Sequence, residues 1–142
     1  FDGVHVSSIG RVGEPSSAAT WISVPATPGS IDILRSVTAV IAGHTPLGYD
    51  RVEDLRLAVS EGAGRLIRAS EHRGAIRASF SIDDTGLDVR LVLRDGAVPR
   101  WPLGPEADPL SWIVIETLTD TAEESVDGSD ACIGLRVGFR RS

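Results

Sequence analysis

The chain has 142 residues, and its 14 arginines and lysines against 20 aspartates and glutamates give a formal net charge of −6. This length is sufficient for one domain with its own hydrophobic core, without support from disulfides or a bound metal. The acidic balance argues against direct binding to nucleic acid, because proteins that follow the phosphate backbone need clustered cations.

Cysteine and histidine usage argues against a disulfide or a metal site. Cys132 is the only cysteine, which excludes an internal disulfide. Its apolar neighbours favour a small buried residue in a strand over a nucleophile. His5, His44 and His72 have no partners at the spacing of metal ligands. We therefore expect neither a metal site nor a histidine-based catalytic triad.

The hydropathy of the chain predicts a cytoplasmic protein that does not bind membranes. The sequence has no run of about 18 apolar residues, the length needed to span a bilayer. Its first 17 residues also lack the apolar segment of a signal peptide.

The beginning of the chain predicts an arm, a strand and a helix. Residues 1–18 are rich in glycine and serine without periodicity, which indicates a flexible arm or a loosely attached edge segment ahead of one domain at 19–142. Alternation over residues 19–26 predicts a strand. The helix predicted at 30–42 carries its apolar residues on one side: Leu34, Val37, Val40 and Ile41.

A long amphipathic helix is predicted over Tyr49–Ser70. Asp50 can cap its start, and two glycines, Gly62 and Gly64, lie inside it. Each glycine costs about 1 kcal/mol relative to alanine, so we expect close approach by another chain element or a ligand at these positions. The apolar residues that recur on one face are Val52, Leu55, Val59, Ala63 and Leu66.

The middle of the chain predicts a hairpin followed by a long loop. Residues 75–82 and 87–93 have the composition of strands, joined by a turn rich in aspartate and glycine. Four prolines then exclude a helix or strand over 94–109. A loop of this length in a small domain is typical of a lid or a binding loop.

The end of the chain predicts a helix and a second hairpin. Asp108 and Pro109 suit the N-cap and first position of a helix that continues over 110–118. Strands at 121–126 and 131–139 follow. The predicted buried side of the helix consists of Leu110, Ile113, Val114 and Leu118.

This order of elements predicts the fold class. Strands that are grouped as hairpins with helices between them indicate an α+β fold. We expect a two-layer sandwich in which three helices cover one face of a mostly antiparallel or mixed sheet.

The segment Val52–Ser70, VEDLRLAVSEGAGRLIRAS, resembles the N-box helix of the GHKL superfamily of ATPases. Within that superfamily it is most similar to the anti-sigma factor serine kinases of bacterial stress and sporulation switches, and the resemblance covers roughly residues 19–141. The residues that carry the helix motif are Asp54, Leu55, Leu57, Ala58, Val59 and Glu61. The resemblance implies a histidine-kinase-like ATPase fold with a site for ATP and Mg²⁺.

The resemblance implies that Glu61 is a general base toward a group that attacks the γ-phosphate. Four residues later the family has an asparagine that holds Mg²⁺, and this chain has Arg65. A guanidinium offers only donors and a positive charge, whereas Mg²⁺ needs oxygen ligands. At i and i+4 the two side chains can pair with each other. A solvated helix pair without a catalytic role is the alternative interpretation.

Two further family motifs have partial counterparts. Asp95 and Gly96 match the start of the box that binds the adenine amino group, although a simple turn is the alternative interpretation. In place of the glycine-rich phosphate loop, the chain has Glu106 and Asp108, whose carboxylates would repel phosphate. We therefore expect Arg65, Asp95 and Gly96 at the nucleotide position, and ATP binding that is weakened or lost.

The resemblance implies an anti-sigma factor that sequesters a sigma factor and is released by an anti-anti-sigma protein of the STAS type. Arg35 matches an arginine of the first helix that contacts both partners in turn, and we expect it to be exposed. The family forms homodimers, for which Trp21 and Ile22 are interface candidates, with core packing as the alternative. An active ATP-dependent serine/threonine kinase and an interaction module without these partners are the alternative functions.

Overall fold

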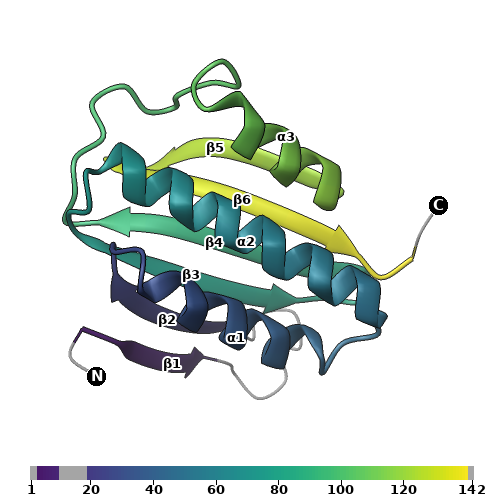
Figure 1. Ribbon diagram of the computed structural model, residues 1–142. Coiled ribbons are helices and arrows are strands. Elements are labelled where there is room, and N and C mark those ends of the chain that lie inside the picture. The colour runs from purple at the N-terminus through teal and green to yellow at the C-terminus, as the bar shows by residue number, and fades with distance from the viewer. Residues whose placement is uncertain (1–2, 10–18, 141–142) are drawn as a thin grey trace.

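The computed structural model describes residues 3–9 and 19–140. The described residues form one sheet and a layer of helices (Figure 1). In chain order the elements are β1 (His5–Ile9), β2 (Ala19–Pro25), α1 (Ser30–Ala42), α2 (Tyr49–Ala69), β3 (Ala75–Ile82), β4 (Gly86–Arg94), α3 (Pro109–Leu118), β5 (Thr121–Asp127) and β6 (Asp130–Gly138).

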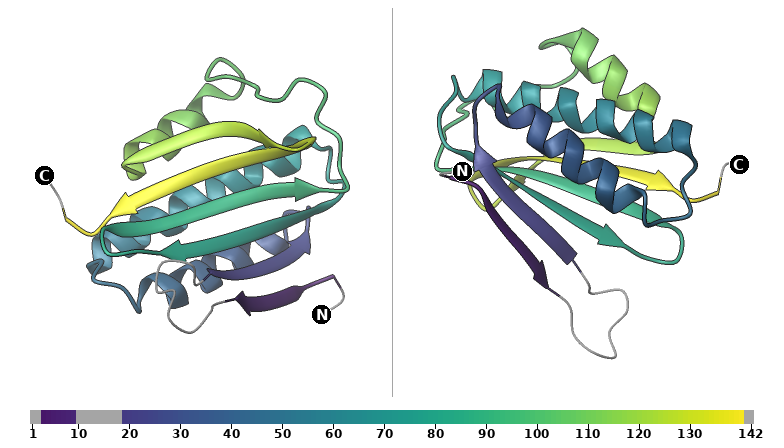
Figure 2. Two further views of the ribbon diagram at one scale, coloured as in Figure 1. Left: turned by 180° about the vertical axis from the view of Figure 1, so that it is seen from behind. Right: turned by 60° about the horizontal axis from the view of Figure 1, so that its bottom comes forward.

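The sheet has the strand order β1-β2-β3-β4-β6-β5, and every neighbouring pair is antiparallel. All three described helices lie on one face of it, and the view from behind shows the strands of the opposite face with no described element in front of them (Figure 2). The predicted α+β two-layer sandwich is confirmed, with an entirely antiparallel sheet.

The predicted elements agree with the observed ones to within one residue at most ends. The strand β1 is an addition, since it comes from the segment that we predicted to be an arm or a loosely attached edge. Residues 10–18 of that segment lie outside the described residues. The start of α2 also differs, because Gly48 is its N-cap and Asp50 lies in its first turn.

The hydrophobic core lies between the sheet and α2. The predicted stripe of α2 is confirmed, because Leu55, Val59, Ala63 and Leu66 are fully buried and Val52 is partly buried against the core. A Cβ added to Gly62 would lie 3.0 Å from Leu91 on β4, so the glycine permits the close packing of helix and sheet that we expected.

Two further expectations concern single side chains. At Gly64 an added Cβ would lie 2.9 Å from the Arg68 guanidinium, so the approaching group comes from the same helix rather than from another element. Cys132 is a free buried thiol on β6, as predicted. Burial raises the pKa of this thiol, which agrees with an unreactive side chain.

The predicted buried side of α3 is wrong in part, since Leu118 packs against the core and Val114 is half-buried but the other two residues are exposed. Leu110 and Ile113 are 71% and 59% exposed. Instead, α3 buries Ser111, Trp112 and Ile115. The helix lies beside α2 and above β5, at the edge of the sheet (Figure 1), so it has no broad apolar layer beneath it. Because its sequence is apolar on several sides, spacing alone did not identify the side that packs.

Candidate functional site between helices α2 and α3

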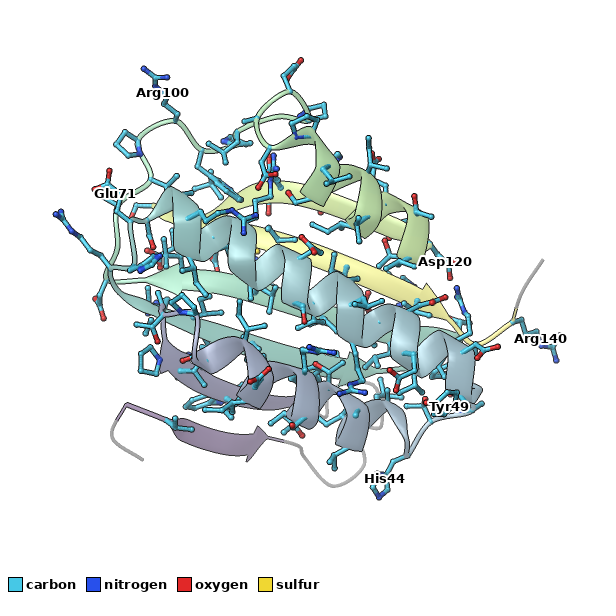
Figure 3. The ribbon with its side chains drawn as sticks, viewed as in Figure 1. His44, Tyr49, Glu71, Arg100, Asp120 and Arg140 are labelled. Atoms are coloured by element: carbon cyan, nitrogen blue, oxygen red, sulfur yellow. The ribbon has the colours of Figure 1, made fainter. Side chains whose placement is uncertain are left out.

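Helices α2 and α3 run antiparallel and are joined by an ion pair at each end. Near the start of α2, the Arg51 guanidinium lies 3.0 Å from the Asp120 carboxylate, which follows the end of α3. Near the end of α2, Arg68 pairs with Asp108, the N-cap residue of α3. Figure 3 labels Asp120 at the C-terminal end of α3. The two pairs fix the position of α3 against α2.

Arg65 lies between these two ends, and its side chain is buried. Only 1% of the side chain is exposed, and its Nε donates to the Glu124 carboxylate at 2.6 Å. The two terminal nitrogens donate to the loop before α3, with distances of 2.6 Å to the carbonyl oxygens of both Gly104 and Ala107. Further acceptors are the carbonyl of Asp108 and the hydroxyl of Ser111, each at 3.1 Å.

Glu124 holds the same loop from the other side. Its side chain is 6% exposed, and its second oxygen accepts a hydrogen bond from the Gly104 amide at 2.9 Å. The Trp112 ring lies 5.3 Å from the Arg65 guanidinium carbon, close enough for a cation–π contact. Arg65 therefore pairs with Glu124 and not with Glu61, and the prediction of a solvated Glu61–Arg65 pair is wrong.

The sequence interpretation missed Glu124, although the strand pattern contained a signal. On β5, Ala122 and Glu124 alternate with Thr121 and Glu123, and Glu124 pairs in register with the buried Ile133 of β6. A carboxylate at a position that faces the core needs a cation. This requirement pointed to an arginine of α2 as the partner of Glu124.

Glu61 lies one turn before Arg65 and has a different environment. It is half-buried and lines a cleft of about 570 Å³ together with Arg68, Asp108, Leu110, Ser111 and Val114. Among the described residues, no hydrogen bond or ion pair involves its carboxylate. The cleft thus contains an ionisable group without a partner beside exposed apolar side chains.

The Asp108 carboxylate at the end of this cleft is held ionised. Partial burial works against the charge, but the hydrogen bond and positive charge of Arg68, with help from Ser111, lower the pKa of Asp108 below its ordinary value. Arg68 and Asp108 therefore neutralise each other, and Glu61 is left as the uncompensated charge of the cleft.

Asp95 and Gly96 lie elsewhere. Asp95 is exposed, has a left-handed backbone with φ of 59°, and lines hollows with Trp21 and Arg77 and with Gly96 and Asp130. Neither Asp95 nor Gly96 lines the cleft that contains Glu61. The hollow that Asp95 and Gly96 line together is therefore distinct from the cleft that contains Glu61.

Arg35 lies on α1, away from this cleft. The side chain is half-buried rather than fully exposed, which departs from the prediction. Its Nε is buried and has no hydrogen-bond partner among the described residues. Of the two interface candidates, Ile22 is 2% exposed and belongs to the core. Trp21 is half-buried, and the Arg77 guanidinium stacks over its ring at 3.9 Å.

The residues at Arg65 do not fit a magnesium nucleotide. The position that would supply an oxygen ligand to Mg²⁺ holds a guanidinium whose donors are directed to Glu124, Ser111 and three loop carbonyls. The loop that would provide free amides for phosphate is tied to this guanidinium instead. A phosphate group would have to displace a buried ion pair and the loop together.

Two further features of the described residues concern metal ions and membranes. In residues 3–9 and 19–140, no three or more histidine, cysteine, aspartate or glutamate side chains gather in a group that could hold a metal ion. None of the helices in that part of the chain combines the length and apolar character that crossing a membrane requires.

The sequence over residues 24–133 matches the family described as the histidine kinase-like ATPase domain. The match covers more than half of the chain, and the chain belongs to this family. A relative, the serine-protein kinase RsbW of Bacillus licheniformis, is 27% identical over 130 residues, which cover 78% of this chain and 81% of the relative. The resemblance identified from the long helix is thereby confirmed.

Proposed function

We propose that this protein is an anti-sigma factor that works by partner exchange without using a nucleotide. It sequesters a sigma factor and releases it when an anti-anti-sigma protein of the STAS type competes for the same surface. Membership of the histidine kinase-like ATPase family and the similarity to a serine-protein kinase named RsbW support this proposal. The family relationship accounts for the fold. The two proposed partners, the sigma factor and the STAS protein, are inferred from the resemblance to anti-sigma factor serine kinases.

The observation that carries the nucleotide-free part of the proposal is the burial of Arg65. Its side chain is 1% exposed and ion-paired to Glu124, so the corner that matches the magnesium ligand is filled by the protein itself. Breaking such a buried pair costs about 3–5 kcal/mol, because it leaves one charge without compensation. A nucleotide would have to overcome this cost before gaining any contact of its own.

Arg35 is the proposed contact for both partners. A guanidinium binds carboxylates through two parallel hydrogen bonds, and a single such contact can serve only one partner at a time. The Arg35 side chain is partly exposed. Its Nε is buried and has no hydrogen-bond partner among the described residues, so an incoming carboxylate would bind the terminal nitrogens. We also propose a homodimer, with Trp21 as a candidate interface residue.

Affinity capture tests the proposed partners. The tagged chain is incubated with native cytosol, and bound proteins are identified; we expect a sigma factor that is displaced by a purified STAS protein. Arg35→Ala should weaken capture of both partners. Arg90→Ala, an exposed arginine on the opposite face of the sheet, is the matched control. Recovery of neither a sigma factor nor a STAS protein would overturn the proposal.

Titration calorimetry with a non-hydrolysable ATP analogue and Mg²⁺ tests the nucleotide-free part. We expect no binding heat at millimolar analogue with the natural chain. Micromolar binding would contradict the proposal. Arg65→Asn restores an oxygen ligand at this position, and its folding must be checked by circular dichroism before binding is compared.

An active serine/threonine kinase is the second candidate. The Glu61 carboxylate, which lines the cleft and pairs with none of the described residues, favours it, because a general base must be free to accept a proton. Incubation with radiolabelled ATP and the STAS partner distinguishes the two functions. Phosphate transfer by the natural chain supports the kinase, whereas transfer that is absent or appears only with Arg65→Asn supports partner exchange alone.

A further inference from the structure

We infer that the cleft between α2 and α3 is a docking site for a basic, amphipathic segment of a protein partner. In this arrangement an arginine or lysine of the segment pairs with Glu61, and apolar side chains of the segment cover Leu110 and Val114. The inference rests on the proposed function for the partner's identity, a sigma factor. A sigma factor binds DNA and therefore carries clustered cations.

The charge of the cleft determines that the occupant must be positively charged. Glu61 has no partner in residues 3–9 and 19–140, whereas Arg68 and Asp108 neutralise each other at the end of the cleft. Asp54 lies two turns before Glu61 on the same side of α2, and none of its contacts in the described residues is an ion pair. An acidic occupant would be repelled, and a purely apolar one would bury Glu61 without compensation.

The apolar part of the cleft comes from the side of α3 that we wrongly predicted to be buried. Leu110 lines the cleft beside Val114 and is 71% exposed. Outside the lining, Ile113 on α3 is 59% exposed and Leu57, one turn before Glu61 on α2, is 46% exposed. Large exposed apolar side chains that gather beside a polar group are typical of an interaction surface. An amphipathic occupant satisfies both the apolar and the acidic part.

The walls of the cleft are already ordered. Arg51–Asp120 and Arg68–Asp108 tie α3 to α2 at both ends, and Arg65 holds the loop that leads into α3. Binding therefore costs little conformational entropy on this side of the interface. The cleft is open to solvent and has a volume of about 570 Å³. It can accept a long basic side chain.

Site-specific photocrosslinking tests where the partner lies. A benzophenone amino acid replaces Leu110 in the full chain, which is then incubated with the captured sigma factor and irradiated. We expect a crosslink to a segment of the sigma factor that contains both basic and apolar residues. The same replacement at Ile82, exposed at the end of β3, is the control. Absence of a crosslink at Leu110, or one to an acidic segment, would overturn the inference.

A charge reversal tests the role of Glu61. We expect Glu61→Arg to weaken sigma-factor binding by at least about tenfold, because it places two like charges together. Asp84→Arg makes the same change in net charge at an exposed position of the β3–β4 turn and should leave binding unchanged. Equal binding by both variants would mean that Glu61 makes no contact, which contradicts the inference.

A pair of synthetic peptides separates the inference from the proposed function. One is a helix of about 16 residues with arginine along one face and leucine along the other. Its counterpart has glutamate in place of every arginine. Fluorescence anisotropy should detect binding of the arginine peptide alone, weakened by Glu61→Arg and not by Asp84→Arg. Equal binding of the two peptides, or no binding of either, contradicts the inference that the cleft is a docking site for a basic segment. Failure to capture a sigma factor contradicts only the proposed function.

Discussion

Arg65 and Glu61 lie one turn apart on α2, yet their surroundings are opposite. The Arg65 side chain is buried and hydrogen-bonded to Glu124, Ser111 and three carbonyls of the loop before α3. Glu61 is half-buried in a cleft, and no described residue pairs with it. Position 65 therefore serves the architecture of the domain, whereas position 61 is available for an external group.

The difference follows from the chemistry of the side chain at position 65. Where an asparagine would leave an oxygen for a metal, an arginine supplies donors that close the loop onto α2. The same closure brings Asp108 and Leu110 beside Glu61. The position that matches the general base of the family thus lies in the cleft that we propose as a docking site, and variants at positions 61 and 65 should behave very differently.

The largest difference is expected in stability. Arg65→Ala should lower the free energy of unfolding by about 3–5 kcal/mol, because it leaves the Glu124 carboxylate buried without a cation. Glu61→Ala should change it by no more than about 0.5 kcal/mol, since no partner is lost. Urea unfolding followed by circular dichroism measures both values. Similar losses in the two variants would contradict the contrast between these positions.

Removing both charges of the buried pair should recover part of that loss. In Arg65→Met with Glu124→Leu no unpaired charge remains, so the double variant should be more stable than either single variant. The carbonyls of Gly104 and Ala107 still lose their donors, and recovery should be incomplete. Hydrogen exchange of the amides in the loop before α3 should be faster in the double variant than in the natural chain. A loop with unchanged protection would show that Arg65 does not hold it.

The sequence predicted the arrangement of the sheet and helices because periodicity and turn residues are local signals. On α2 the apolar residues follow a single stripe, and the predicted face was the observed one. On α3 the apolar residues surround the helix, and only the position of its neighbours determined that Leu110 is exposed. Spacing alone therefore identified α3 as a helix without identifying its buried side.

The candidate site was predicted in part for the same reason. Glu61 and Arg65 were found because they belong to one helix motif, and the misfit with Mg²⁺ follows from the chemistry of a guanidinium. The partner of Arg65 was missed because Glu124 lies 59 residues away on β5. Tertiary packing determines which residues pair over such a sequence separation. The i, i+4 rule for helices predicts only the local pair of Glu61 and Arg65.

The exposed ion pair at the end of the cleft should contribute much less than the buried one. In the Arg68–Asp108 pair the side chains are 54% and 40% exposed, and water screens their attraction. Arg68→Ala should therefore cost no more than about 1 kcal/mol of unfolding free energy. Arg56→Ala, which breaks the Glu53 pair on α2, is a matched control of similar type. A loss as large as that of Arg65→Ala would remove the distinction between buried and exposed pairs.

The smallest effect is expected at the β3–β4 turn, where it should depend on pH. The Thr85 amide, the Arg136 guanidinium and the Thr85 hydroxyl hold the pKa of Asp83 well below its ordinary value of 3.8. A carboxyl group whose pKa is lowered in the folded state stabilises the fold at pH values above its ordinary pKa. That contribution is lost as the pH falls toward the folded-state pKa. Asp83→Asn should therefore be less stable than the natural chain at pH 7, with a difference that shrinks below about pH 4. Urea unfolding from neutral to acid pH measures it, with Asp84→Asn as the neighbouring control. A difference that is constant over this range would mean that the Asp83 charge does not stabilise the turn.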